Sequence, residues 1–220
     1  MHRRRPTAAL LAWLLAIAAL AAAPPAQATT GPRTPQAEIF ATSNTAIITD
    51  PADPRLRTRL TRFDRQVRRI IADNGARTRR STLLDGVFWS SDLQQATYER
   101  SRRFDLDRTD PLELHHIADL IRKQFRQESV LTFEHLPSGS PRADAVRIQV
   151  PGLDVRRLHD GLAADPAARD RLYGGSVTLR GHLILVAELA DLDLARRFVT
   201  RIGGDWNRAT LHHGDREFVG

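Results

Sequence analysis

The chain has 220 residues, with 33 basic and 26 acidic side chains that give a formal net charge of +7 at neutral pH. It contains no cysteine, which excludes a disulfide framework, a thiolate metal site, a cysteine nucleophile and haem attached through cysteine. All basic residues except Lys123 are arginine, a bias typical of a GC-rich bacterial genome, so the basic composition does not by itself indicate a nucleic-acid partner.

The first 28 residues have the layout of a secretory signal peptide. Three arginines at positions 3–5 precede an apolar run over residues 8–23, and the small residues Ala26 and Ala28 provide a cleavage site. The apolar run is shorter than the roughly 20 residues of an ordinary membrane-spanning helix. We therefore expect a secreted, extracytoplasmic protein that is cleaved near Ala28-Thr29, keeps no transmembrane anchor and meets no nucleic acid.

The first predicted elements follow a flexible leader over residues 29–36. Residues 37–49 are apolar and β-branched, which predicts a strand. Asp53 followed by Pro54 is typical of a helix start, with a carboxylate cap and proline at the first position. Apolar residues at helical spacing continue from there until Asn74-Gly75, which favours a helix end.

Three strands and one helix complete the first half of the chain. The strands are predicted over residues 83–90, 98–107 and 129–136. The helix begins at Asp110-Pro111 in the manner of a capping box, with Glu113 at the third position. The element order is therefore that of the split β-α-β arrangement.

The same order recurs after a cluster of turn-forming residues at 137–141. Strands are predicted over residues 145–150, 176–180, 182–189 and 207–213, and helices from Asp154 and across residues 194–202. The two middle strands form a hairpin around Gly181.

This repetition predicts an α+β fold of two tandem ferredoxin-like units. The segments are a signal peptide (1–28), a leader (29–36), a first unit (37–136), a linker (137–143), a second unit (144–213) and a tail (214–220). Residues 87–89 and 183–187 are apolar at consecutive positions, which indicates strands buried on both faces. Because helices cover only one face of each sheet, we expect the two sheets to pack on each other as a pseudo-dimeric barrel or sandwich.

Three stretches of the first unit form a pattern: the strand opening Glu38-Ile39-Phe40, the helix from Arg55, and residues 125–131. The pattern resembles a small family of exported bacterial domains of unknown function, in which a helix ends in a Phe-x-Gln-x-Ser-Val-Leu run that enters the last strand. The resemblance covers residues 37–133. It implies an exported ferredoxin-like domain and carries no activity with it.

Three carboxylates inside apolar strands are the catalytic candidates: Asp85, Glu134 and Glu188. A buried carboxylate is costly unless it is paired, so each is expected to have an arginine partner. A carboxylate with a raised pKa would serve as a general acid or base. Structural ion pairing is the interpretation that we favour. The arginines considered as partners are Arg102, Arg147 and Arg180.

Four residues are candidates for lining a ligand cavity between the sheets: Trp89, Phe133, His135 and His182. No cofactor is predicted, and haem bound through His135 or His182 is the alternative. The histidine pairs at 115–116 and 212–213 do not supply the three or four ligands of a metal site, so no metal is predicted.

The outer face of the first helix is rich in arginine, and Arg62, Arg65 and Arg69 are its candidates for contact with an anionic surface. The usual sequence motifs of hydrolases and phosphate-binding loops are absent. We therefore expect a non-enzymatic module, monomeric or homodimeric, that binds a small ligand or a cell-envelope component. One alternative is a small-molecule or haem-binding enzyme of the dimeric α+β barrel type. Another is a binder of anionic envelope polymers through the first helix.

Overall fold

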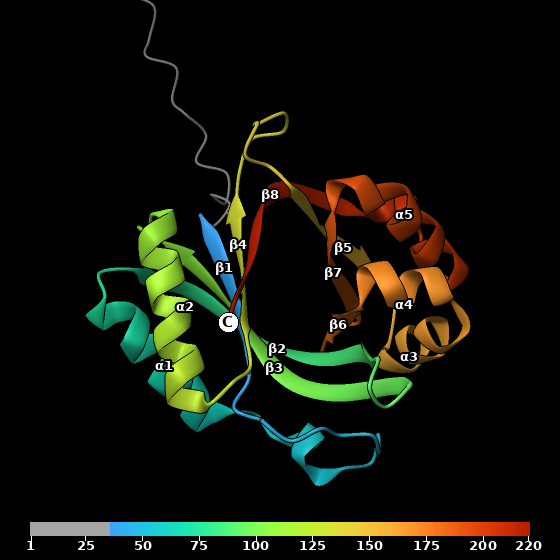
Figure 1. The fold of residues 1–220 in the computed structure, drawn as a ribbon, viewed down its shortest axis with the longest axis horizontal. Coiled ribbons are helices and arrows are strands. Elements are labelled where there is room, and N and C mark those ends of the chain that lie inside the picture. The colour runs from blue at the N-terminus through green and yellow to red at the C-terminus, as the bar shows by residue number, and fades with distance from the viewer. Residues whose placement is uncertain (1–35) are drawn as a thin grey trace, which may run out of the picture. The chain divides into compact units, whose positions relative to one another are not determined.

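A computed structural model describes residues 36–220, so the expected signal peptide and almost all of the leader lie outside the described residues. Within this range, eight antiparallel strands close into a barrel in the order β1-β3-β2-β6-β7-β5-β8-β4 (Figure 1). The strands are β1 (Ala37–Ala41), β2 (Arg77–Ser90), β3 (Gln95–Asp107), β4 (Val130–His135), β5 (Ala145–Pro151), β6 (Gly174–Thr178), β7 (His182–Glu188) and β8 (Thr210–Val219).

Five α-helices lie on the outside of the barrel, in two groups on opposite sides (Figure 1). One group is α1 (Thr61–Asp73) and α2 (Pro111–Phe125), and the other is α3 (Val155–Ala164), α4 (Pro166–Leu172) and α5 (Leu192–Arg201). Short 3-10 turns occur at Pro54–Arg57, Leu189–Asp191 and Trp206–Arg208. Among residues 36–220, no helix combines the length and apolar composition needed to span a membrane.

Each group of helices covers its own hydrophobic core on the outer side of the barrel wall. Ile39 and Phe104 pack beneath α1 and α2, whereas Ile148 and Leu183 pack beneath the other three helices. Because side chains alternate along a strand, the residues between these positions point into the barrel. Glu38 and Phe40 of β1 are therefore interior residues.

The prediction of two ferredoxin-like sandwiches packed sheet to sheet is wrong. The two four-stranded segments join edge to edge at two seams, which we define as the β2–β6 and β4–β8 pairings. These hydrogen bonds produce one closed sheet in place of two stacked ones. The consecutive apolar residues that suggested facing sheets are explained by helices outside the wall and side chains inside it.

Several elements match their sequence signals. The side chain of Asp110 accepts a hydrogen bond from the backbone N–H of Glu113 (2.9 Å), so α2 begins as predicted. α1 ends at the predicted Asn74-Gly75, and β6 and β7 form the predicted hairpin.

Other elements differ from their sequence signals at the ends. The cap at Asp53 starts only the 3-10 turn, and α1 begins at Thr61, after Leu60, whose φ of 49° interrupts the helix. The first strand ends at Ala41, well before the predicted residue 49. β8 continues to Val219, because residues assigned to the tail pair with β4.

Candidate functional site

A cavity of about 610 Å³, here called the interior cavity, lies inside the barrel. Its wall consists mainly of aromatic and aliphatic side chains, among them Phe40, Phe88, Leu131, Ile184, Val186 and Phe218. Seven of the strands contribute to it. Tyr173 and Phe218 line it and are also 56% and 57% exposed, so they mark its mouth. The volume and lining are those of a site for a small organic molecule.

Small residues on neighbouring strands leave room for the cavity. Gly86 of β2 lies opposite Glu99 of β3 in the ladder. A Cβ atom at Gly86 would lie 2.6 Å from the ring of Phe88, so only glycine lets this ring fold back against the wall. Gly174 and Ser176 continue the small surface onto β6.

Glu99 is the one carboxylic acid in the wall of the interior cavity. Its side chain is partly buried, and burial raises its pKa, while a hydrogen bond with the Ser101 side chain opposes the shift in part. The raised pKa favours the protonated form, which donates a hydrogen bond where a carboxylate only accepts. The wall therefore combines a mainly apolar surface with a single carboxylic acid.

Arg216 of β8 is the basic residue of the same wall. Its Nη2 donates a hydrogen bond to Oε1 of Glu188 (2.7 Å), and its guanidinium lies 5.8 Å from the centre of the Phe218 ring. Because Glu188 compensates its charge, Arg216 does not make the cavity an anion site.

Charged residues fill the barrel interior beyond the cavity. We call Glu38, Arg103, Asp105, His135 and Arg147 the central charge cluster. Oε1 of Glu38 lies 3.3 Å from Nε of Arg147 and 3.2 Å from Nε2 of His135, and Nε of Arg103 lies 2.9 Å from Oδ1 of Asp105.

These contacts determine the protonation of the cluster. Burial acts to raise the pKa of Glu38, but the hydrogen bond from His135 and the charges of Arg147 and Arg103 outweigh it, and the net shift is downward. His212 packs edge-on to His135, with ring centres 5.2 Å apart. Burial, assisted by the charge of Arg147, lowers the pKa of His212 to about 4. The cluster therefore holds an ionised Glu38, and a neutral His212 packs against its His135.

The three predicted catalytic carboxylates pair with three different arginines, and none lines the interior cavity. Asp85 pairs with Arg100, Glu134 pairs with Arg142, and Glu188 pairs with Arg216. Each is engaged in an ion pair with an arginine. The arginines that the sequence analysis considered, at positions 102, 147 and 180, are not these partners.

The four predicted ligand-binding residues occupy different environments. Trp89 packs against the outer core beneath α3 to α5, with the guanidinium of Arg169 4.3 Å from its ring centre. Phe133 is fully buried and stacks edge-on with His135. His182 lines a separate hollow on another part of the barrel. None of the four lines the interior cavity.

The predicted anionic-surface residues Arg62, Arg65 and Arg69 are exposed on α1. Across residues 36–220, no group of three or more histidine and acidic side chains is arranged to hold a metal ion.

Sequence reasoning missed Glu99 and, within the central charge cluster, Glu38, Arg103 and Asp105, although it had named His135 and Arg147 in other roles. Glu99 belongs to the polar run of residues 98–103, which gives no hint that alternate members face a cavity. A signal did exist for Glu38, since it stands between the apolar residues Ala37 and Ile39 at the start of a predicted strand.

Comparison with known proteins gives little to set beside this geometry. No protein-family model matches the chain, and no curated protein matches it. A solved structure from Lactobacillus acidophilus NCFM, provisionally assigned as a monooxygenase, is 12% identical, with 86% of this chain and 98% of that chain covered. Its TM-score is 0.27, so this likeness has no bearing on fold or function.

Proposed function

We propose that this protein is an exported binding module for a small, mainly apolar organic molecule that carries a hydrogen-bond acceptor. The observation that supports it is the apolar wall of the interior cavity with Glu99 as its one carboxylic acid. An apolar ligand would displace water from Phe40, Phe88, Leu131 and Ile184. A carbonyl or ether oxygen on the ligand would accept a hydrogen bond from the protonated carboxyl group of Glu99.

The polarity of the wall supports a largely uncharged ligand. The raised pKa of Glu99 favours its neutral form, and Arg216 is compensated by Glu188. An ionised ligand would have to move its charge from water into a cavity that offers no opposite charge to pair with it, which is unfavourable.

Binding of the neutral, apolar dye N-phenylnaphthylamine tests the proposal. We expect the dye to bind with one-to-one stoichiometry and enhanced fluorescence. V186F adds a ring to the cavity wall and should weaken binding by about tenfold or more. L112F adds the same ring at a side chain on α2 that is 84% exposed and should leave binding unchanged. Equal dye affinity in the two variants, both folded by circular dichroism, would refute a ligand site in this cavity.

Enzymatic use of the same cavity is the second candidate, and the raised pKa of Glu99 favours it. A carboxylic acid whose pKa is raised by burial keeps its proton to higher pH than a free carboxyl group does, which suits it to general acid catalysis. Mass spectrometry of a captured ligand after prolonged incubation separates the two functions. A binding module returns the ligand unchanged, whereas an enzyme yields a product that the E99Q variant does not form.

Export is part of the proposal and rests on the first 28 residues. Amino-terminal sequencing of protein recovered outside the cytoplasm should begin near Thr29. A chain recovered there with Met1 intact would contradict cleavage.

A further inference from the structure

A second hollow, of about 810 Å³ and here called the arginine cleft, opens in the barrel wall beside the β6–β7 turn. The ladder between β2 and β6 involves Leu84 to Phe88 of β2. Residues 80–83, earlier in β2, have β3 on one side only, and the cleft lies along this stretch. It is separate from the interior cavity, with which it shares no lining residue.

Positive charge dominates the arginine cleft. Seven arginines line it, together with one carboxylate, Asp64. They come from the segment before α1, from β2 and β3, and from the β6–β7 turn. Such a concentration of guanidinium groups in one concave surface favours an anionic ligand.

Four of the seven arginines already form ion pairs with carboxylates of the protein. Arg102 lies 3.3 Å from Asp64 and Arg100 pairs with Asp85. Arg80 and Arg103 both contact Asp105, each at 2.9 Å.

The other three are Arg57, Arg59 and Arg180, and within residues 36–220 none of them forms an ion pair. All three are exposed. Their charge is therefore available to a ligand.

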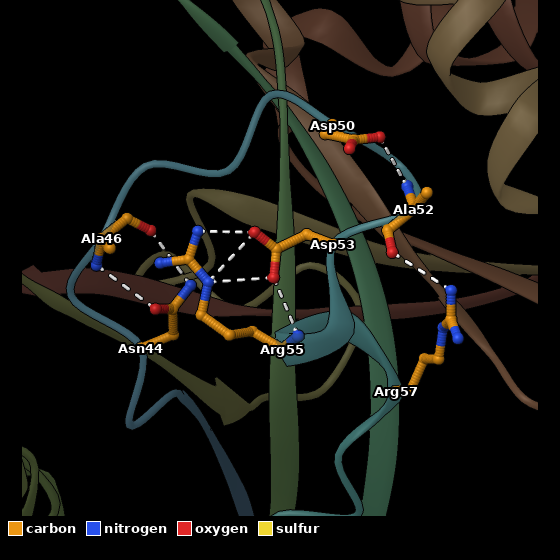
Figure 2. A network of polar contacts seen from close by, with 7 residues as sticks. All are labelled: Asn44, Ala46, Asp50, Ala52, Asp53, Arg55 and Arg57. Atoms are coloured by element: carbon orange, nitrogen blue, oxygen red, sulfur yellow. Dashed lines mark hydrogen bonds and ion pairs between the residues drawn. The ribbon is translucent and has the colours of Figure 1, made fainter.

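The position of Arg57 is set by the chain segment that carries it. Figure 2 shows that the carboxylate of Asp53 accepts hydrogen bonds from the side chain of Arg55, with 2.9 Å between Nε and Oδ1, and from the backbone N–H of Arg55. Nη2 of Arg57 donates to the backbone carbonyl of Ala52 at 3.2 Å (Figure 2). The local hydrogen bonds thus neutralise Arg55 and leave Arg57 without a counter-charge.

A buried group in the cleft lining points to the same kind of ligand. Arg103 is 5% exposed, and its Nε and Nη1 have no hydrogen-bond partner of acceptable geometry despite the nearby Asp105 and Glu38. Burial also lowers the pKa of Arg102, and the neighbouring charges of Arg68 and Arg100 add to the shift against Asp64. An anion in the cleft would accept hydrogen bonds from the unpartnered nitrogens of Arg103 and would stabilise the positive charge of Arg102.

We propose that the arginine cleft binds a phosphate dianion, either free or as the terminal group of a small organic phosphate. Guanidinium groups form paired hydrogen bonds with phosphate oxygens and match their geometry. Two negative charges suit a cleft with three uncompensated arginines better than the single charge of a carboxylate does. This site is independent of the ligand proposed for the interior cavity.

Isothermal titration calorimetry at low ionic strength, with inorganic phosphate and with phenyl phosphate, tests the proposal. The double variant R59Q/R180Q should bind either probe about tenfold more weakly, or worse. The control R62Q/R65Q removes the same charge from exposed positions on α1 and should change affinity by less than about threefold, because neither side chain lines the cleft. Tighter binding of phenyl phosphate would identify an organic phosphate as the ligand, and equal binding would identify free phosphate.

Two results would overturn the proposal. One is equal weakening in both double variants, which would make the effect one of net charge. The other is absence of binding to the unmodified protein by either probe at about 10 mM, a concentration at which even weak sites fill. Thermal unfolding of both double variants should match that of the unmodified protein, since the four substituted arginines form no ion pair within residues 36–220.

Discussion

Glu99 and Gly86 stand directly opposite each other in the β2–β3 ladder, so an acidic side chain faces a position without one. This pairing gives the partly buried Glu99 carboxyl group space inside the barrel. The same geometry raises the pKa of Glu99 through burial and makes the group measurable by its effect on stability.

Glu99 should make the folded state less stable as the pH rises, and this pH dependence should be absent from the E99Q variant. The pKa of Glu99 is raised in the folded state above the reference value of 4.5. Its stabilising contribution is therefore fully present below about pH 4.5 and is lost as the pH rises through the folded-state pKa. Thermal unfolding of both proteins at a series of pH values measures the difference. A constant difference between them from pH 4 to pH 8 would argue against a raised pKa for Glu99.

His212 should produce a pH dependence of the opposite sign. Burial lowers its pKa from 6.5 to about 4. Between these two pH values His212 is therefore protonated in the unfolded chain and neutral in the folded protein. Stability is then lost as the pH falls from about 6.5 toward 4. Because the side chain is only half-buried, solvent screening limits the loss to about 1–2 kcal/mol. In H212Q, urea unfolding should show a smaller loss of unfolding free energy over this pH interval. If the unfolding free energy of H212Q falls with pH as steeply as that of the unmodified protein, the lowered pKa of His212 is contradicted.

Local signals in the sequence predict where several helices begin and end, because a cap needs only its immediate neighbours. Asp110 and Asp154 both cap helices as their sequence contexts indicate. Asp53 has the same signal but starts only a short turn, since the backbone at Leu60 adopts a left-handed conformation that the local pattern does not reveal. Local chemistry is therefore a better guide to helix ends than to helix length.

The interior cavity could not be predicted in the same way, because its wall depends on pairings between distant segments. Phe40, Glu99 and Phe218 meet through the closure of the barrel. Asp85 and Glu134 stand in apolar runs, yet Asp85 shares its register position with Arg100 and Glu134 meets Arg142 from the following loop. Strand alternation gives two possible faces for each residue, and only the seams decide which face is the interior.

Removal of Glu38 from the central charge cluster should strongly destabilise the fold. In E38A, the buried Arg147 and His135 lose their shared carboxylate, and an uncompensated buried charge costs about 3–5 kcal/mol. The matched control is E134A, which breaks the more exposed pair with Arg142 and should cost at most about 1 kcal/mol. Urea denaturation measures both, and similar losses in the two variants would show that the cluster is not essential to stability.

Closure of the barrel depends on Gly214, at the β4–β8 seam. A Cβ atom there would overlap both the backbone oxygen of Glu134 and the ring of Phe133. Since backbone atoms of a paired strand cannot move aside without breaking the ladder, G214A should lower the free energy of unfolding by about 1–3 kcal/mol. G220A is the control, because its nearest neighbour would be a backbone oxygen 3.9 Å away, and it should be neutral. Hydrogen exchange provides the second measurement: backbone amides of Val130–His135 should lose protection in G214A while those of the β2–β6 seam retain it. Equal protection of both seams in G214A would mean that the strands accommodate the added methyl group.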